Sequence, residues 1–138
     1  MELKILRKEE IGILHRQWMW ADYIKQLYES SLKSTSNEVL ISPLRFYAYP
    51  VGCYMSLWYA LLFSVLEQFR TKKIKIKIVE PDIGELYDSL EKLRHAVFHA
   101  PYKYWDMRWF NPLKVKGAGN KIRKIHNTIG EVFLDVMK

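Results

Sequence analysis

The chain has 138 residues, with 22 lysines and arginines against 15 aspartates and glutamates, so its formal net charge is +7 at pH 7. This length suits one domain with its own core, and we assign residues 1–138 to a single domain that needs no structural metal. The single cysteine, Cys53, excludes a disulfide within the chain, and we expect it to be buried as a small apolar residue. The basic excess favours a polyanionic partner such as a nucleic acid.

The first residues carry charges rather than the apolar core of a signal peptide, so we expect a cytoplasmic protein. From about Lys8 to Lys33, apolar residues recur at three- and four-residue steps, which predicts a long helix with one buried stripe. Further along, Ser42 followed by Pro43 is typical of a cap and a first-turn proline, and it predicts a short helical piece. The stripe of the long helix consists of Ile11, Leu14, Trp18, Ala21, Ile24 and Tyr28.

A second long helix is predicted from about Pro50 to Arg70, and it is apolar on two sides. Two apolar faces require two neighbours, which places this helix at the centre of a bundle or at an interface. The segment from Phe46 to Leu66 contains no charged residue and is long enough to cross a bilayer. Because it also contains a proline, a glycine, serines and several tyrosines, we favour a buried helix and expect no membrane association. One face carries Tyr54, Trp58, Leu61, Val65 and Phe69, and the other carries Met55, Leu62 and Leu66.

Strict alternation of lysine and isoleucine from Lys73 to Ile78 has the period of an extended strand. Since no partner strand is apparent, we interpret the segment as an extended connector, or as one arm of a small hairpin or intersubunit pair. Its lysines either form a solvated edge or follow a phosphate backbone, and the first interpretation is favoured.

A third helix is predicted to begin at Asp82, where an acidic cap and Glu85 can satisfy each other's free backbone donors. Pro101 requires this helix to end near His99 or Ala100. A fourth helix is predicted to begin with Asn120 as its cap and to end near Val136. The sequence therefore predicts an all-α bundle of four to five up-and-down helices, with the Lys/Ile connector between the second and third long helices.

The end of the third helix reads Leu93-Arg94-His95-Ala96-Val97-Phe98-His99. Arginine can hold a phosphate through two parallel hydrogen bonds, and histidine has an ordinary pKa suited to proton transfer near neutrality. Metal-independent RNA cleavage needs a base for the 2′-hydroxyl, an acid for the leaving 5′-oxygen and a cation for the phosphorus oxygens. His99 is the candidate acid or base, Arg94 the candidate phosphate clamp, and His95 a candidate that orients His99 or contacts phosphate.

These residues, followed by Lys103-Tyr104-Trp105-Asp106, resemble the HEPN superfamily, whose hallmark is Arg, a polar residue, three further residues and His. Arg94, His95 and His99 match that pattern position for position, and the surroundings look most like the abortive-infection and toxin branch. The resemblance implies an all-helical domain, usually dimeric and often a metal-independent endoribonuclease, acting as a toxin or defence effector. A cognate antitoxin or a partner nucleotidyltransferase is also implied. One toxin branch has a modifiable tyrosine two residues after the histidine, where this chain has Pro101.

On a helix that turns about 100° per residue, Arg94 and His99 diverge by roughly 140°. Two copies related by a two-fold axis can bring both arginines and both histidines into one groove, so we expect a homodimer that binds RNA. The face of the second long helix that bears Tyr54, Trp58, Leu61 and Val65 is the candidate dimer seam.

Other residues are weaker candidates. Arg94 could instead pair with Glu91 or Asp88 on its own helix, and the whole domain could be a non-catalytic module that binds RNA, a nucleotide or a partner protein.

His15 and His126 are expected at the surface or half-buried. The histidines and the cysteine lack zinc-site spacing, and we predict no metal and no cofactor. Candidate RNA-binding residues are Lys103, Tyr104, Lys114, Lys116, Lys121, Arg123 and Lys124.

Overall fold

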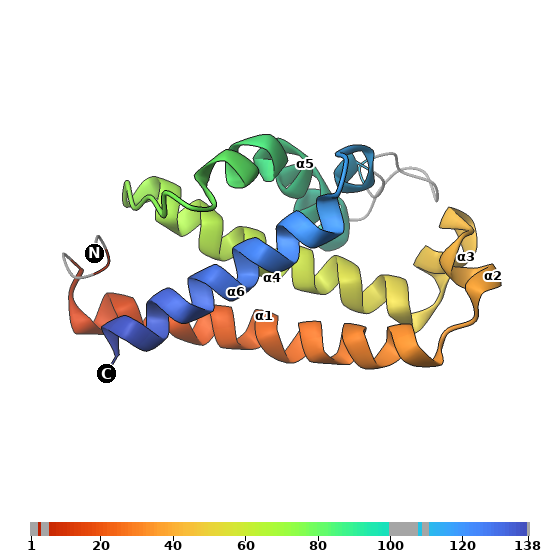
Figure 1. Cartoon of the computed structure of the whole chain (residues 1–138), viewed down its shortest axis with the longest axis horizontal. Helices are drawn as coiled ribbons and strands as arrows, with labels where there is room; N and C mark the ends of the chain where they lie inside the picture. The colour runs from red at the N-terminus through yellow and green to blue at the C-terminus, as the bar shows by residue number, and fades with distance from the viewer. Residues whose placement is uncertain (1–2, 4–5, 100–107, 109–110, 138) are drawn as a thin grey trace.

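The computed structural model describes residues 3, 6–99, 108 and 111–137, and this part of the chain contains helices and turns but no strand. Long helices α1 (Lys8–Ser34), α4 (Pro50–Thr71), α5 (Glu80–Phe98) and α6 (Ala118–Val136) alternate in direction (Figure 1). Contacts of α1 with α4, of α4 with α5, of α5 with α6 and of α6 with α1 close a ring around the core. Short helices α2 (Asn37–Leu40) and α3 (Pro43–Ala48) join α1 to α4, and the 3-10 turn η3 (Asn111–Lys114) precedes α6. The all-α class is confirmed.

Helix α4 is the central helix, as its two apolar faces predict. Its residues pack against α1 on one side and against α5 on the other. It is the one described helix long and apolar enough to cross a membrane, yet 61% of its most apolar window is buried inside the protein. Its apolar character is therefore accounted for by the core of the bundle.

The predicted dimer seam on α4 is wrong in its central residues. Trp58 and Val65 are 1% and 0% exposed within a single chain, because α1, α5 and α6 surround this helix on its apolar sides. Side chains already covered inside one copy cannot form a seam with another. The prediction that Cys53 is buried is also wrong, because Cys53 is exposed near the start of α4.

The Lys/Ile segment connects α4 to α5, but it forms no strand. Lys73 adopts a left-handed conformation with φ of 57°, the N–H of Ile74 donates to the Phe69 carbonyl at 2.8 Å, and the N–H of Lys73 donates to the Arg70 carbonyl at 3.1 Å. This is a Schellman helix end, with lysine where glycine is usual. The alternating pattern has a different cause from sheet pairing: Ile74 and Val79 are buried against the core, Ile76 is partly buried, and Ile78 is exposed.

Two predicted helix starts are corrected. Helix α5 begins at Glu80 rather than Asp82, because Pro81 fits the first turn and Glu80 and Asp82 both complement the positive end of the helix dipole. Helix α6 begins at Ala118 rather than after Asn120, because Gly117 takes the left-handed conformation with φ of 68° at its N-cap. The predicted short helix is confirmed as α3, where the Ser42 side chain accepts from the Arg45 N–H.

Helix α6 approaches α1 closely at Gly130, where the Trp18 indole fills the space that a β-carbon would need. We expect Gly130→Ala to lower the free energy of unfolding by about 1–3 kcal/mol, because the indole must shift from its packed position. Gly12→Ala is the matched control: nothing lies within 4 Å of that β-carbon position in α1, so the better helix former should raise stability by about 0.5–1 kcal/mol. Urea unfolding measures both, and equal effects would contradict the close packing.

Candidate functional site

Arg94 lies where α5 packs against α4, and its guanidinium contacts two side chains of α4. Nη1 and Nη2 donate to Oε1 and Oε2 of Glu67 at 2.8 and 3.2 Å, a bidentate geometry. The guanidinium carbon also lies 4.6 Å from the centre of the Phe63 ring. The Arg94 side chain is 28% exposed, so its position is fixed while part of it still faces solvent.

Sequence reasoning considered Glu91 and Asp88 on the same helix as partners of Arg94, whereas the structure pairs Arg94 with Glu67 on α4. The signal for this contact was present in the sequence. Glu67 is the single carboxylate in the whole of α4, and a lone carboxylate near the end of an otherwise apolar helix needs a cationic partner.

His95 and His99 lie at the exposed end of α5. Helix α5 ends at Phe98, and His99 follows as its C-cap in an extended conformation, with φ of −121° and ψ of 123°. The imidazole rings of His95 and His99 stack with their centres 4.3 Å apart and their planes 29° apart. The predicted 140° divergence between Arg94 and His99 assumes a helical His99 and therefore does not hold, whereas His95 lies where it can orient the His99 ring.

The candidate RNA-binding residues have different positions. Lys103 and Tyr104 lie outside the described residues, and Lys114 and Lys116 are exposed around the turn before α6. Lys121 donates to Glu85 at 2.8 Å, and Lys124 lies 3.7 Å from Asp82, so both pair with carboxylates of α5. Arg123 donates to Glu29 of α1 at 2.8 and 3.4 Å. These three cations join helices of the bundle.

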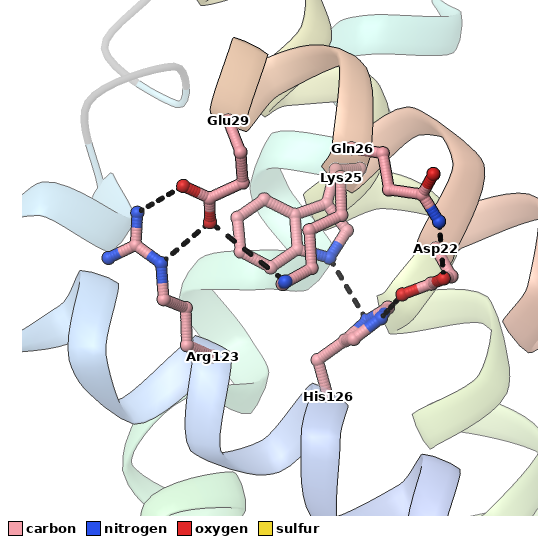
Figure 2. A network of polar contacts seen from close by, with 7 residues as sticks. Asp22, Lys25, Gln26, Glu29, Arg123 and His126 are labelled. Atoms are coloured by element: carbon pink, nitrogen blue, oxygen red, sulfur yellow. Dashed lines mark hydrogen bonds and ion pairs between the residues drawn. The ribbon is translucent and has the colours of Figure 1, made fainter. Parts of the chain in front are cut away.

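The prediction that His126 is at the surface or half-buried is wrong: its side chain is 0% exposed and lies in a polar network between α1, α4 and α6. The indole N–H of Trp58 donates to Nδ1 of His126 at 3.1 Å, and the Trp18 indole donates to the His126 carbonyl at 2.9 Å. On the other side, Nε2 of His126 lies 2.8 Å from Oδ1 of Asp22. Figure 2 shows Asp22 with Gln26, and Glu29 with Lys25 and Arg123, as the rest of this network.

The Trp58 contact identifies the protonation state of His126. An indole N–H can only donate, so Nδ1 must be the acceptor, and the proton sits on Nε2, which donates to Asp22. Burial lowers the pKa of His126, while the hydrogen bond and charge of Asp22 partly oppose that shift. The sequence signal was its spacing, since Ile122, His126, Ile129 and Phe133 share one helix face. A fully enclosed ring serves the fold rather than a reaction with solvent-borne substrate.

Within the described part of the chain, no group of three histidine, cysteine or carboxylate side chains is close enough together to hold a metal ion. No family model, curated protein or solved structure matches the chain significantly. The candidate site is therefore defined by its own side chains: Arg94 with Glu67 and Phe63, and the exposed pair of His95 and His99.

Proposed function

We propose that this protein is a metal-independent endoribonuclease of the HEPN type, with His99 as acid or base and Arg94 as the clamp on the scissile phosphate. The observation that carries the proposal is the neighbourhood at the end of α5: a partly exposed guanidinium, fixed by Glu67, belongs to the residue just before His95, and His95 stacks on the exposed His99. A positioned arginine can hold a phosphate and a solvent-facing histidine can transfer a proton near neutral pH, so the two side chains supply functions that RNA cleavage needs.

In this reaction, one imidazole nitrogen accepts the proton of the 2′-hydroxyl, and the resulting oxyanion attacks the phosphorus. A protonated imidazole then supplies a proton to the leaving 5′-oxygen, which gives a 2′,3′-cyclic phosphate and a free 5′-hydroxyl. The Arg94 guanidinium offsets the charge that grows on the non-bridging oxygens. Stacking on His95 limits the orientations of the His99 ring before substrate arrives.

Glu67 occupies the place that a phosphate would take on Arg94. Carboxylate and phosphate both accept two parallel hydrogen bonds from a guanidinium, so the substrate phosphate can exchange for Glu67 without a change in the direction of Arg94. In the free protein, the Glu67 carboxylate thus orients the Arg94 guanidinium, and it also competes with the substrate phosphate for that guanidinium.

We place the homodimer contact at the end of α5 rather than on α4. Phe98 is 56% exposed between His95 and His99, and an exposed aromatic side chain at this point suits contact with a second copy. A two-fold axis near Phe98 brings two histidine pairs together, as the shared groove requires. A toxin or defence role, with an antitoxin or nucleotidyltransferase as partner, belongs to the same proposal.

The test is incubation of the purified protein with 5′-labelled single-stranded RNA, with and without EDTA. We expect products that end in a 2′,3′-cyclic phosphate, formed at the same rate in both samples, because no step above involves a metal ion. Glu67→Gln should bind RNA more tightly than wild type, since Arg94 loses its competing charge. A requirement for a divalent ion in the chemical step would contradict the mechanism.

The alternative is a non-catalytic module that binds RNA, a nucleotide or a partner protein. The bidentate ion pair between Arg94 and Glu67 favours it, because an arginine that joins two helices also has a purely structural use. RNA binding without any cleavage product in the same assay would identify this alternative.

A further inference from the structure

A cavity of about 520 Å³ lies where the end of α4, the connector and the start of α5 meet. This volume is in the range typical of small-molecule sites. Its floor is apolar, with Phe69 from α4, Ile74 from the connector and Ile83 from α5. Its rim carries three cations, Arg70, Lys73 and Lys75, against the single carboxylate of Glu80. An apolar floor beneath a cationic rim suits a ligand that is flat or apolar at one end and anionic at the other.

Arg70 presents a flat cation at this rim. Its guanidinium carbon lies 3.4 Å from the centre of the Tyr87 ring, so the two planar groups are in contact. Arg70 is exposed, and within the described part of the chain it forms no ion pair with a carboxylate. Its N–H groups are therefore available to an anion, and a nucleobase can stack on a guanidinium plane of this kind.

Lys73 lines the same cavity from an unfavourable backbone conformation. It has a φ of 57° at the end of α4, where glycine would meet no steric penalty. Strain at a non-glycine residue is a pointer to function when the side chain reaches a candidate site, as that of Lys73 does.

A row of contacting side chains between α4 and α5 connects the cavity to the Arg94 site. Glu67 and Arg70 are one turn apart on α4, and Tyr87 and Arg94 are seven residues, or about 10 Å, apart on the same side of α5. Arg94 lies over the Phe63 ring, the Phe63 and Tyr87 rings pack edge to face with their centres 4.8 Å apart, and Arg70 lies over the Tyr87 ring. A single strand of RNA with one phosphate on Arg94 can reach the cavity within a few nucleotides.

We propose that this cavity binds one nucleotide of single-stranded RNA within a few nucleotides of the scissile phosphate, with the phosphate of that nucleotide on Lys73 and Arg70 and its base against the apolar floor and the Arg70 plane. The inference rests on the proposed ribonuclease function for its substrate class. A nucleotide combines the anionic and the flat apolar part that the rim and the floor each require.

The test measures binding of a fluorescein-labelled single-stranded 2′-O-methyl octaribonucleotide by anisotropy at several salt concentrations. This probe lacks the attacking hydroxyl, so cleavage does not enter the result. We expect Lys73→Gly to weaken binding and to lower the slope of log K against log salt by about one, because one phosphate contact is lost. Arg70→Gln should weaken binding about tenfold through the loss of stacking and charge.

Lys77→Ala is the matched control, because Lys77 belongs to the same connector but does not line this cavity. It should leave affinity within about twofold of wild type. Lys73→Gly should unfold at the same urea concentration as wild type or a higher one, since glycine suits its φ. Equal effects of Lys77→Ala and Lys73→Gly, or no effect of Lys73→Gly and Arg70→Gln, would overturn the proposal. If wild type binds the probe through these residues yet cleaves no RNA, the ribonuclease function fails while the cavity assignment stands.

Discussion

Replacement of His99 by alanine is expected to reduce the rate of RNA cleavage by about 100-fold or more, while the free energy of unfolding stays close to that of wild type. General acid–base catalysis by a positioned side chain contributes about 10²–10⁴-fold, and this contribution is lost with the imidazole. His99 is exposed beyond the last residue of α5, so its removal leaves no buried cavity and no unpaired buried group. Cleavage rates and urea unfolding curves of the same preparations measure both quantities.

Lys92→Ala is the control for this variant. Lys92 is exposed on α5 near the histidine pair, and its replacement removes a long polar side chain without touching the stacked rings. It should keep most of the activity. If His99→Ala and Lys92→Ala lose activity equally, or if His99→Ala loses its cooperative unfolding, His99 has a structural rather than a catalytic role.

The four long helices could be predicted from periodicity because each buries a stripe at three- and four-residue steps, and α1 and α4 begin where the sequence indicates. The conformation of the connector between α4 and α5 could not be predicted in this way. Alternation of lysine and isoleucine occurs both in strands and in turns such as this one, which buries Ile74 and part of Ile76, and sheet pairing requires a partner strand that the sequence does not supply. The Schellman end of α4 could not be recognised in the sequence either, because Lys73 occupies the position where glycine is usual.

In the candidate site, too, the residues that are close in sequence could be predicted and the contacts between distant residues could not. Arg94 and the histidine pair are close in sequence, so a local pattern was enough to single them out. Glu67 contacts Arg94 from 27 positions earlier, and Asp22 contacts His126 across 104 positions. Such contacts depend on how α4, α5, α1 and α6 pack, and one sequence gives only the weaker sign of a polar residue on an apolar face.

The second large effect concerns His126, whose replacement is expected to destabilise the protein more than any surface change. His126→Ala removes a fully buried ring, leaves the Trp58 N–H without a partner and leaves Gln26 as the remaining partner of the Asp22 carboxylate. Cavity formation and the unpaired Trp58 N–H together should cost about 3–5 kcal/mol, or about 10–17 °C in melting temperature. Thermal unfolding followed by circular dichroism measures it, with the exposed Asn127→Ala on the same helix as control.

Acidification should act on the same ring. The pKa of His126 lies below its ordinary value of 6.5 in the folded chain because of burial, with Lys25 adding to the shift and Asp22 opposing it. The unfolded chain therefore binds a proton more readily, and the free energy of unfolding should fall as the pH drops from above 6.5 toward the folded pKa, by up to about 1.4 kcal/mol per pH unit. The lowered pKa of Glu29 adds a similar loss only in the more acidic range of carboxylates.

His126→Phe isolates the contribution of the titrating ring, because phenylalanine fills the space but cannot bind a proton. We expect this variant to be less stable than wild type at pH 8, since Asp22 and the Trp58 N–H lose a partner. Between pH 7.5 and 5.5, its free energy of unfolding should fall less steeply with pH than that of wild type, because the variant lacks the titrating ring. A wild-type stability that rises on acidification would instead mean that His126 is charged and forms an ion pair with Asp22. That result would require the Trp58 indole to turn away from Nδ1, because two N–H donors cannot share one hydrogen bond.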